Sequence, residues 1–172
     1  MDNSEWLKQY LGKVAESSPE GRQAVQYVRE RKIKIGFRRA RKSVGAFWTI
    51  TRRFYLNTRH YSPESSLDNP RAWTLFLHEV RHLQQGPIMA ISIYGEMDAW
   101  QYEFRIYKRM TGKELHPLLE ELLALPLSFD RSILRQARGL MTKFAGKGYG
   151  AWILPLYPIT KEIQHFFTRK PE

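Results

Sequence analysis

Two histidines and a glutamate near the middle of the chain have the types and the spacing of a metal-dependent hydrolytic site. They belong to the run His78-Glu79-Val80-Arg81-His82, an H-E-x-x-H pattern. Residues four apart on a helix lie on the same face, so both imidazoles can bind one metal ion. Glu79 then points to the open side of that ion, where it can deprotonate a bound water.

The helix that must carry this pattern is predicted over Pro70–Gln85. Asn69 is the expected N-cap, followed by a proline at the first helical position, and Gly86-Pro87 should end the helix. Apolar residues recur at helical spacing and predict a buried face: Ala72, Trp73, Phe76, Val80 and Leu83. The pattern is therefore expected on an element packed firmly enough to hold two ligands still.

A catalytic zinc site normally has a third protein ligand and leaves the fourth position open to water. A second helix, predicted over residues 93–110, carries Glu96, Asp98 and Glu103. Glu96 and Glu103 fall on nearly one face, whereas Asp98 points away from both. Glu96 is the predicted third ligand, with Glu103 as a group that supports a ligand or as an alternative ligand.

With these residues in place, the chain resembles the gluzincin clan of zinc metallopeptidases, in particular the small single-domain minigluzincins and bacterial metallopeptidases of unknown substrate. The resemblance is carried by residues 78–82 and by Glu96-Met97-Asp98-Ala99, in which the third-ligand glutamate precedes a small residue. In that clan an acidic residue often follows the small residue and supports a histidine ligand, but this chain has Trp100 there. Asp98 or Glu103 could take the supporting role instead.

The expected fold is α+β and zincin-like, as a single domain over residues 1–172. Three segments before the metal helix have strand-like patterns: residues 33–38, 44–51 and 53–58. Their short connections favour a three-stranded antiparallel sheet. Further helices are predicted on both sides of this unit: residues 4–16, 19–32, 115–125 and 130–144. The resemblance implies that an edge strand, either 44–51 or 53–58, accepts an extended peptide.

The chain has 172 residues, of which 42% are hydrophobic, and this predicts one domain with a substantial core. It has no cysteine, which excludes disulfides and thiolate metal sites and suits a cytoplasmic location. The polar start does not resemble a signal peptide, and no apolar run is long enough to span a membrane. We expect a monomer.

The formal net charge is +11, and the basic residues are unevenly distributed. Eleven Lys or Arg occur between Arg29 and Arg59, against one acid, Glu30, and residues 38–42 are predicted to form a basic hairpin turn. This stretch is either a solvated surface that discourages aggregation between sheet edges or a surface for an anionic partner. Aromatic residues are interleaved with it, although strands are often aromatic: Phe37, Phe47, Trp48, Phe54 and Tyr55.

The predicted function is a zinc-dependent peptidase that acts on a peptide or protein substrate, with Glu79 as the general base. Such a site also needs a donor to the oxyanion, and Tyr149, Tyr157, His165 and Arg81 are the candidates. The alternative is a basic module that binds nucleic acid or an anionic surface and keeps a structural or vestigial metal site. A third hypothesis is a peptidase fold that has lost activity and works by protein contact.

Overall fold

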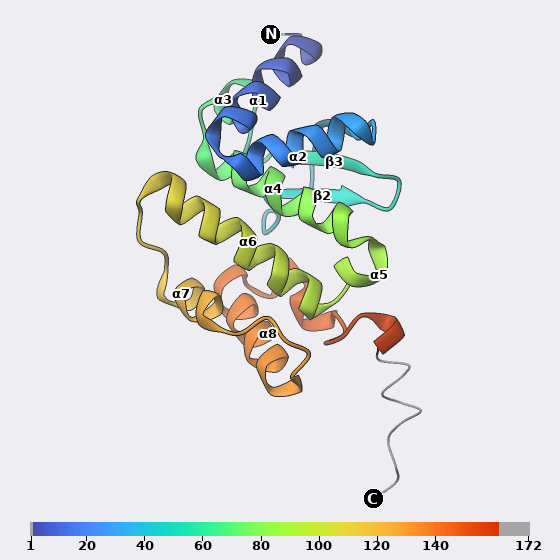
Figure 1. Ribbon diagram of the computed structural model, residues 1–172, viewed down its shortest axis with the longest axis vertical. Coiled ribbons are helices and arrows are strands. Elements are labelled where there is room, and N and C mark those ends of the chain that lie inside the picture. Colours follow the sequence, from blue (N-terminus) through green and yellow to red (C-terminus); the bar gives the residue numbers. More distant parts are fainter. Residues whose placement is uncertain (1, 162–172) are drawn as a thin grey trace, which may run out of the picture.

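Two helices run side by side in opposite directions through the middle of the molecule (Figure 1). They are α4 (Pro70–Gln85) and α6 (Ile93–Thr111), and the short helix α5 (Pro87–Ala90) joins them. Successive helices with a short connection pack as antiparallel neighbours. The polar side chains on the facing surfaces of α4 and α6 therefore lie close together.

The computed structural model describes residues 2–161, and within that range the protein is mostly helical with one small sheet. The other elements are α1 (Asn3–Ser17), α2 (Pro19–Glu30), β1 (Lys34–Arg38), β2 (Ala46–Thr49), β3 (Arg53–Asn57), α3 (Pro63–Leu67), α7 (Pro117–Ala124), α8 (Arg131–Ala145) and the 3-10 turns η1 (Lys147–Tyr149) and η2 (Ala151–Ile153). The predicted α+β class, the three strands and the additional helices are confirmed. None of the described helices has the length and apolar character needed to cross a membrane.

Local signals set the ends of α4 and α6. Asn69 Oδ1 accepts the backbone N–H groups of Arg71 and Ala72, and Gly86 ends α4 with a φ of 76°. The bounds predicted for α4 are confirmed at both ends. In the first turn of α6, Gly95 lies close to the backbone of α5. A Cβ at this position would lie 2.1 Å from the carbonyl oxygen of Met89, so a glycine is needed here.

The sheet differs from the prediction. Its order is β1-β3-β2, in which the central strand β3 is antiparallel to β2 but parallel to β1. The all-antiparallel sheet is therefore wrong, because only the second of the two short connections makes a hairpin. Residues 39–45, which include most of the predicted basic hairpin turn, instead cross over the end of β3.

Asn57, at the end of β3, fixes this crossover and is fully buried. Its Oδ1 accepts the backbone N–H groups of Ala40 and Arg59, and its Nδ2 donates to the carbonyls of Arg41 and Val44. One buried amide thus satisfies loop groups that have no strand to pair with.

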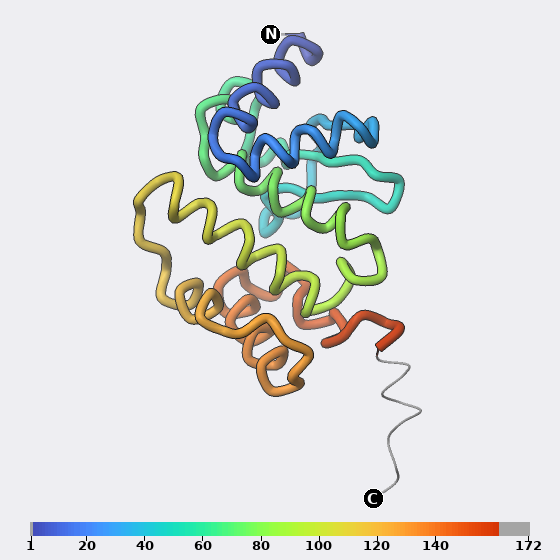
Figure 2. The backbone as a smooth tube through the Cα atoms, in the orientation of Figure 1, coloured from blue at the N-terminus to red at the C-terminus, as the bar shows by residue number. Residues whose placement is uncertain are grey.

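Buried apolar side chains form two clusters, one on each side of the α4–α6 pair. The first joins α1, α2, the sheet and α4, which are blue to green in Figure 2; the second joins α6 to α7, α8 and the turns that follow, which are yellow to red. Within the first cluster, Phe54 of β3 meets Phe76 of α4 edge to face at 5.4 Å. Between the clusters lie buried polar groups: His78, Glu79, His82 and Glu103.

Candidate metal centre

Three side chains from α4 and α6 converge between the two clusters. The Nε2 atoms of His78 and His82 lie 2.9 Å apart. Glu96 faces them from the first turn of α6, with one carboxylate oxygen 3.9 Å from Nε2 of His78 and the other 3.6 Å from Nε2 of His82. One ligand atom from each residue lies within 4.8 Å of the others, so the three could hold a metal ion. Both histidines are buried, and Glu96 is 14% exposed at its side chain.

Glu103 supports His78 and is not positioned as a ligand itself. Its Oε2 lies 2.9 Å from Nδ1 of His78, and its other carboxylate oxygen pairs with the guanidinium of Arg71. Arg71 also lies over the ring of Phe104, which keeps its guanidinium in place. A carboxylate beside Nδ1 favours the tautomer that leaves Nε2 free to bind a metal.

His82 is held by an amide that was not among the predicted site residues. Oε1 of Gln85 lies 3.0 Å from Nδ1 of His82, while Nε2 of Gln85 donates to the Gly95 carbonyl at 3.0 Å and to Asp98 at 2.7 Å. Because the amide nitrogen has two acceptors, the amide oxygen must accept from His82, and the network assigns the proton to Nδ1. Position 85 lies three residues after His82 on the same helix face, and that spacing was the available signal.

Asp98 does not reach either histidine. Its two carboxylate oxygens accept from Nε and Nη2 of Arg81 at 2.8 and 3.1 Å, and one of them also accepts from Gln85. Arg81 therefore pairs with Asp98 on the side away from the ligand atoms and is not placed to act on an oxyanion. Asp98 acts on His82 through Gln85: it accepts a hydrogen bond from the Gln85 amide, and that amide orients the His82 ring.

Glu79 lies between the converging ligands and the sheet, with only 5% of its surface exposed. Burial, together with Glu96 and Glu103, raises the pKa of Glu79 to about 8, although His78 opposes the shift. The backbone N–H of Trp48 donates to this carboxylate, and the Trp48 ring lies 6.2 Å from that of His82. Trp48 belongs to β2, which among residues 2–161 pairs with β3 on one side only, so the other edge of β2 faces the site.

The pKa values of the two histidines are shifted in opposite directions. Burial would lower the pKa of His78, but the carboxylates of Glu103, Glu79 and Glu96 outweigh it and raise that pKa to about 9. Burial lowers the pKa of His82, and the neighbouring His78 adds to the effect. The concentration of carboxylates around His78 is an environment that attracts a cation.

Of the three candidates for an oxyanion donor that lie within the described residues, Tyr149 is the one found at the site. Its hydroxyl donates to Glu96 at 2.6 Å and accepts from Nε1 of Trp100 at 2.8 Å. Burial and Glu96 raise the pKa of Tyr149 well above its usual value, so the hydroxyl keeps its proton. Tyr157 is instead buried in the second cluster, with its ring 6.4 Å from that of Phe129, and His165 lies outside the described residues.

A pocket of about 270 Å³ opens beside these groups. His78, Glu79 and Tyr149 line it on one side, and Ala46 and Leu75 give it an apolar wall. Cationic groups from the crossover loop and from the start of α4 also line it: Lys42 and Arg71. The general-base candidate therefore borders a space that a side chain of a substrate could fill.

Comparisons with family models, with curated proteins and with solved structures gave no significant match. The functional argument therefore depends on the chemistry and geometry of the site itself.

Proposed function

We propose that this protein is a zinc-dependent peptidase with a zincin-like fold. The observation that carries the proposal is the convergence of two imidazoles and a carboxylate beside a buried glutamate, at the free edge of a strand. This donor set suits zinc, which binds imidazole nitrogen and carboxylate oxygen and in catalytic sites has three protein ligands. The ionic contact of Glu103 with His78 and the hydrogen bond of Gln85 with His82 fit the same ion, since they leave Nε2 of each histidine as the ligand atom.

His78, His82 and Glu96 would hold the zinc ion, which would supply Lewis-acid chemistry towards the scissile carbonyl and the attacking water. Glu79 is placed to take a proton from the attacking water and to pass it to the leaving amine. The hydrogen bond from the Trp48 N–H holds its carboxylate in the site.

Tyr149 is the proposed oxyanion donor. It is neutral, its hydroxyl lies against Glu96, and Trp100 fixes its position from the other side. A donor held close to the place where charge develops is worth several kcal/mol, and here only the hydroxyl proton has to turn from Glu96 to the oxyanion.

The free edge of β2 is the proposed docking site for the substrate backbone, through its backbone groups other than the Trp48 N–H that donates to Glu79. Unpaired N–H and C=O groups of an edge strand can bind an extended peptide without reading its side chains. The pocket beside Glu79 would then receive one substrate side chain next to the scissile bond.

The test combines metal analysis with one conservative variant. Purified protein should contain about one zinc per chain, as three-ligand sites of this kind do. Glu79→Gln should keep the zinc and abolish hydrolysis of unfolded casein, whereas Glu114→Gln, the same change at an exposed glutamate, should alter neither. A Glu79→Gln protein that cleaves as fast as the parent would overturn the mechanism.

A further inference from the structure

One face of the sheet is turned away from the core, and its side chains share one kind of chemistry. Side chains alternate along a strand, so Lys34 and Arg38 of β1 share this outer face with Arg53 of β3. The mixed pairing places Lys34 opposite Arg53. All three cations are exposed.

Two aromatic rings lie in the middle of the same face. Tyr55 of β3 is paired with Phe47 of β2, and their rings are 5.4 Å apart and tilted by 34°. Both are half-buried, and neither belongs to the side chains that pack against the two core clusters. Gly36, opposite Tyr55 on β1, has no side chain to cover the ring, and the guanidinium of Arg38 lies 5.9 Å from its centroid.

The charge around this face is not neutralised within the described residues. All eleven Lys and Arg between Arg29 and Arg59 are exposed, and none takes part in an ion pair there. Elsewhere in the described chain, cations such as Arg71, Arg81 and Arg109 are each paired with an acid. A surface of one sign next to aromatic rings fits a partner that carries negative charge and flat rings.

We propose that the outer face of the sheet binds single-stranded nucleic acid. Bases stack on the rings of Tyr55 and Phe47, and phosphates contact Lys34, Arg38 and Arg53. Stacking on an aromatic ring requires bases that are not already stacked in a duplex, so a single strand is the partner that uses every feature of this face. The function goes beyond the proposed peptidase, because the opposite face of the sheet packs towards α4 and the metal centre.

The probe is a fluorescein-labelled oligothymidylate of about 16 nucleotides, the upper end of known site sizes for single-strand-binding folds. Its anisotropy is measured with the full chain at several salt concentrations. Lys34→Gln/Arg53→Gln should weaken binding and flatten the dependence of log K on log salt by about 0.7 for each phosphate that the variant no longer neutralises. Tyr55→Thr, which keeps a strand-forming residue but removes the ring, should weaken binding by about tenfold at every salt concentration.

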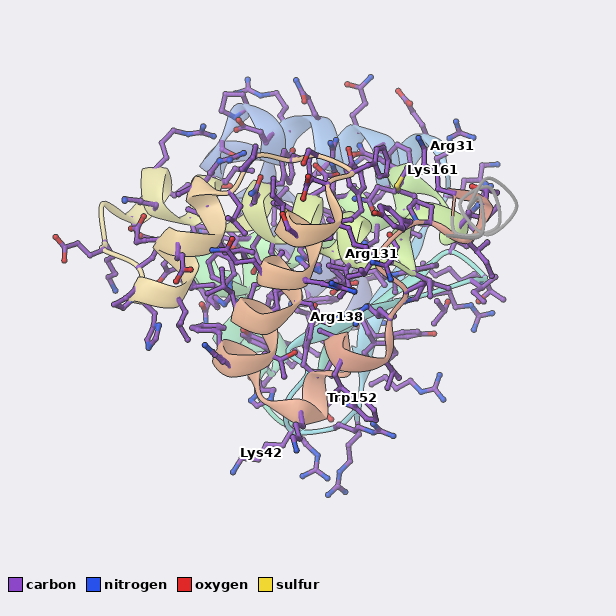
Figure 3. The ribbon with its side chains drawn as sticks, turned by 90° about the horizontal axis from the view of Figure 1, so that it is seen from below. Arg31, Lys42, Arg131, Arg138, Trp152 and Lys161 are labelled. Atoms are coloured by element: carbon purple, nitrogen blue, oxygen red, sulfur yellow. The ribbon has the colours of Figure 1, made fainter. Side chains whose placement is uncertain are left out.

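The matched control is Arg131→Gln/Arg135→Gln, which removes the same charge from α8. That helix lies on the other side of the α4–α6 pair from the β2–β3 hairpin (Figure 1), and Figure 3 shows Arg131, at the start of α8, well apart from Lys42 of the crossover loop. This control should bind the oligonucleotide within about twofold of the parent, since distant exposed charges are screened. Glu79→Gln and removal of metal should leave binding unchanged, so this proposal and the peptidase proposal can fail separately.

Results of three kinds would overturn the proposal: on charge, on stacking and on the type of partner. The first is an equal loss of binding in the α8 control, which would mean a response to net charge alone. The second is binding of a duplex as tight as that of the single strand, or no effect of Tyr55→Thr in a variant that keeps the circular dichroism spectrum of the parent. The third is binding to phosphatidylserine vesicles without binding to the oligonucleotide, which would assign the face to a lipid surface.

Discussion

The side-chain amide of Gln85 fixes the ring of His82 in one orientation. Its oxygen lies 3.0 Å from Nδ1 of His82, while its nitrogen is held by Asp98 and by the Gly95 carbonyl. The ligand atom of His82 is therefore set by a residue of its own helix together with two residues of α6. The metal centre and the packing of α4 on α6 depend on each other for this reason.

Replacing Gln85 by Leu should weaken zinc binding by about 10- to 100-fold, the usual effect of removing the partner of a ligand histidine. The variant keeps all three ligands, so zinc should still bind with the same stoichiometry. Competition with a chromogenic chelator measures the affinity. Gln84→Leu, the same change at the exposed neighbouring position, is the control and should match the parent. Equal affinities for the Gln85 variant and the parent would contradict the role of the amide.

Variants of Glu96 and Glu103 should differ in zinc content, because Glu96 is the proposed ligand and Glu103 is the proposed supporting group. Glu96→Ala should lose stoichiometric zinc, because two imidazoles alone do not complete the site. Glu103→Gln should retain zinc with affinity lowered by about 10- to 100-fold, since it removes the charge beside His78 Nδ1. Metal analysis after dialysis, with Glu114→Gln as the control, distinguishes them. If the Glu103 variant lost its zinc and the Glu96 variant kept it, Glu103 would be the ligand.

Tyr149→Phe should lower kcat by about 10²- to 10³-fold, the effect of losing one oxyanion donor, with little change in KM. Zinc content should not change, because the hydroxyl meets Glu96 as a donor and Glu96 keeps both carboxylate oxygens. Steady-state kinetics on one peptide substrate give the two constants. Tyr107→Phe on α6 removes a hydroxyl outside the pocket and should behave as the parent. A change confined to KM would mean that Tyr149 only binds substrate.

Asn57→Ala should destabilise the fold by about 3 kcal/mol, because four part-buried loop groups lose a hydrogen bond worth about 0.5–1.5 kcal/mol each. The measurement is the free energy of unfolding from urea titration followed by tryptophan fluorescence. Thr58→Ala, at an exposed adjacent residue, should change it by less than about 0.5 kcal/mol. A change of that small size for Asn57→Ala would show that the crossover does not depend on its amide.

The parts of the fold that could be predicted from the sequence are those with local causes. The bounds of α4 follow from Asn69, Pro70 and Gly86, which act within one turn of the helix ends. The order of the sheet could not be found this way, since it depends on Asn57 meeting backbone groups up to 17 positions away. Short connections favour hairpins on average. Here residues 39–45 form a crossover instead, and their backbone groups bond the buried side-chain amide of Asn57.

The residues of the candidate site likewise fall into two groups, those predictable from spacing along one helix and those placed by packing between elements. The spacing of His78 and His82 is a property of one helix, and Glu96 followed from one assumption, that the next helix packs against it. The spacing of Gln85 from His82 on one helix face was a signal for its contact with that ring. The role of the Trp48 backbone depends on how α4 packs against β2, and no pattern along the chain reports that. Tyr149 and Tyr157 are equivalent as residue types, and only packing places one at the site and the other in the core.

Tyr149 comes from a turn that follows α7 and α8, whereas the ligands come from α4 and α6. Because synthesis runs from the N-terminus, α4 and α6 leave the ribosome before α8 and the turn that carries Tyr149. A nascent protein of the proposed kind would bind its ion while still lacking the hydroxyl that stabilises the reaction. Proteolytic activity would stay about 10²- to 10³-fold lower until the turn after α8 docks, which would spare other unfinished polypeptides from premature cleavage.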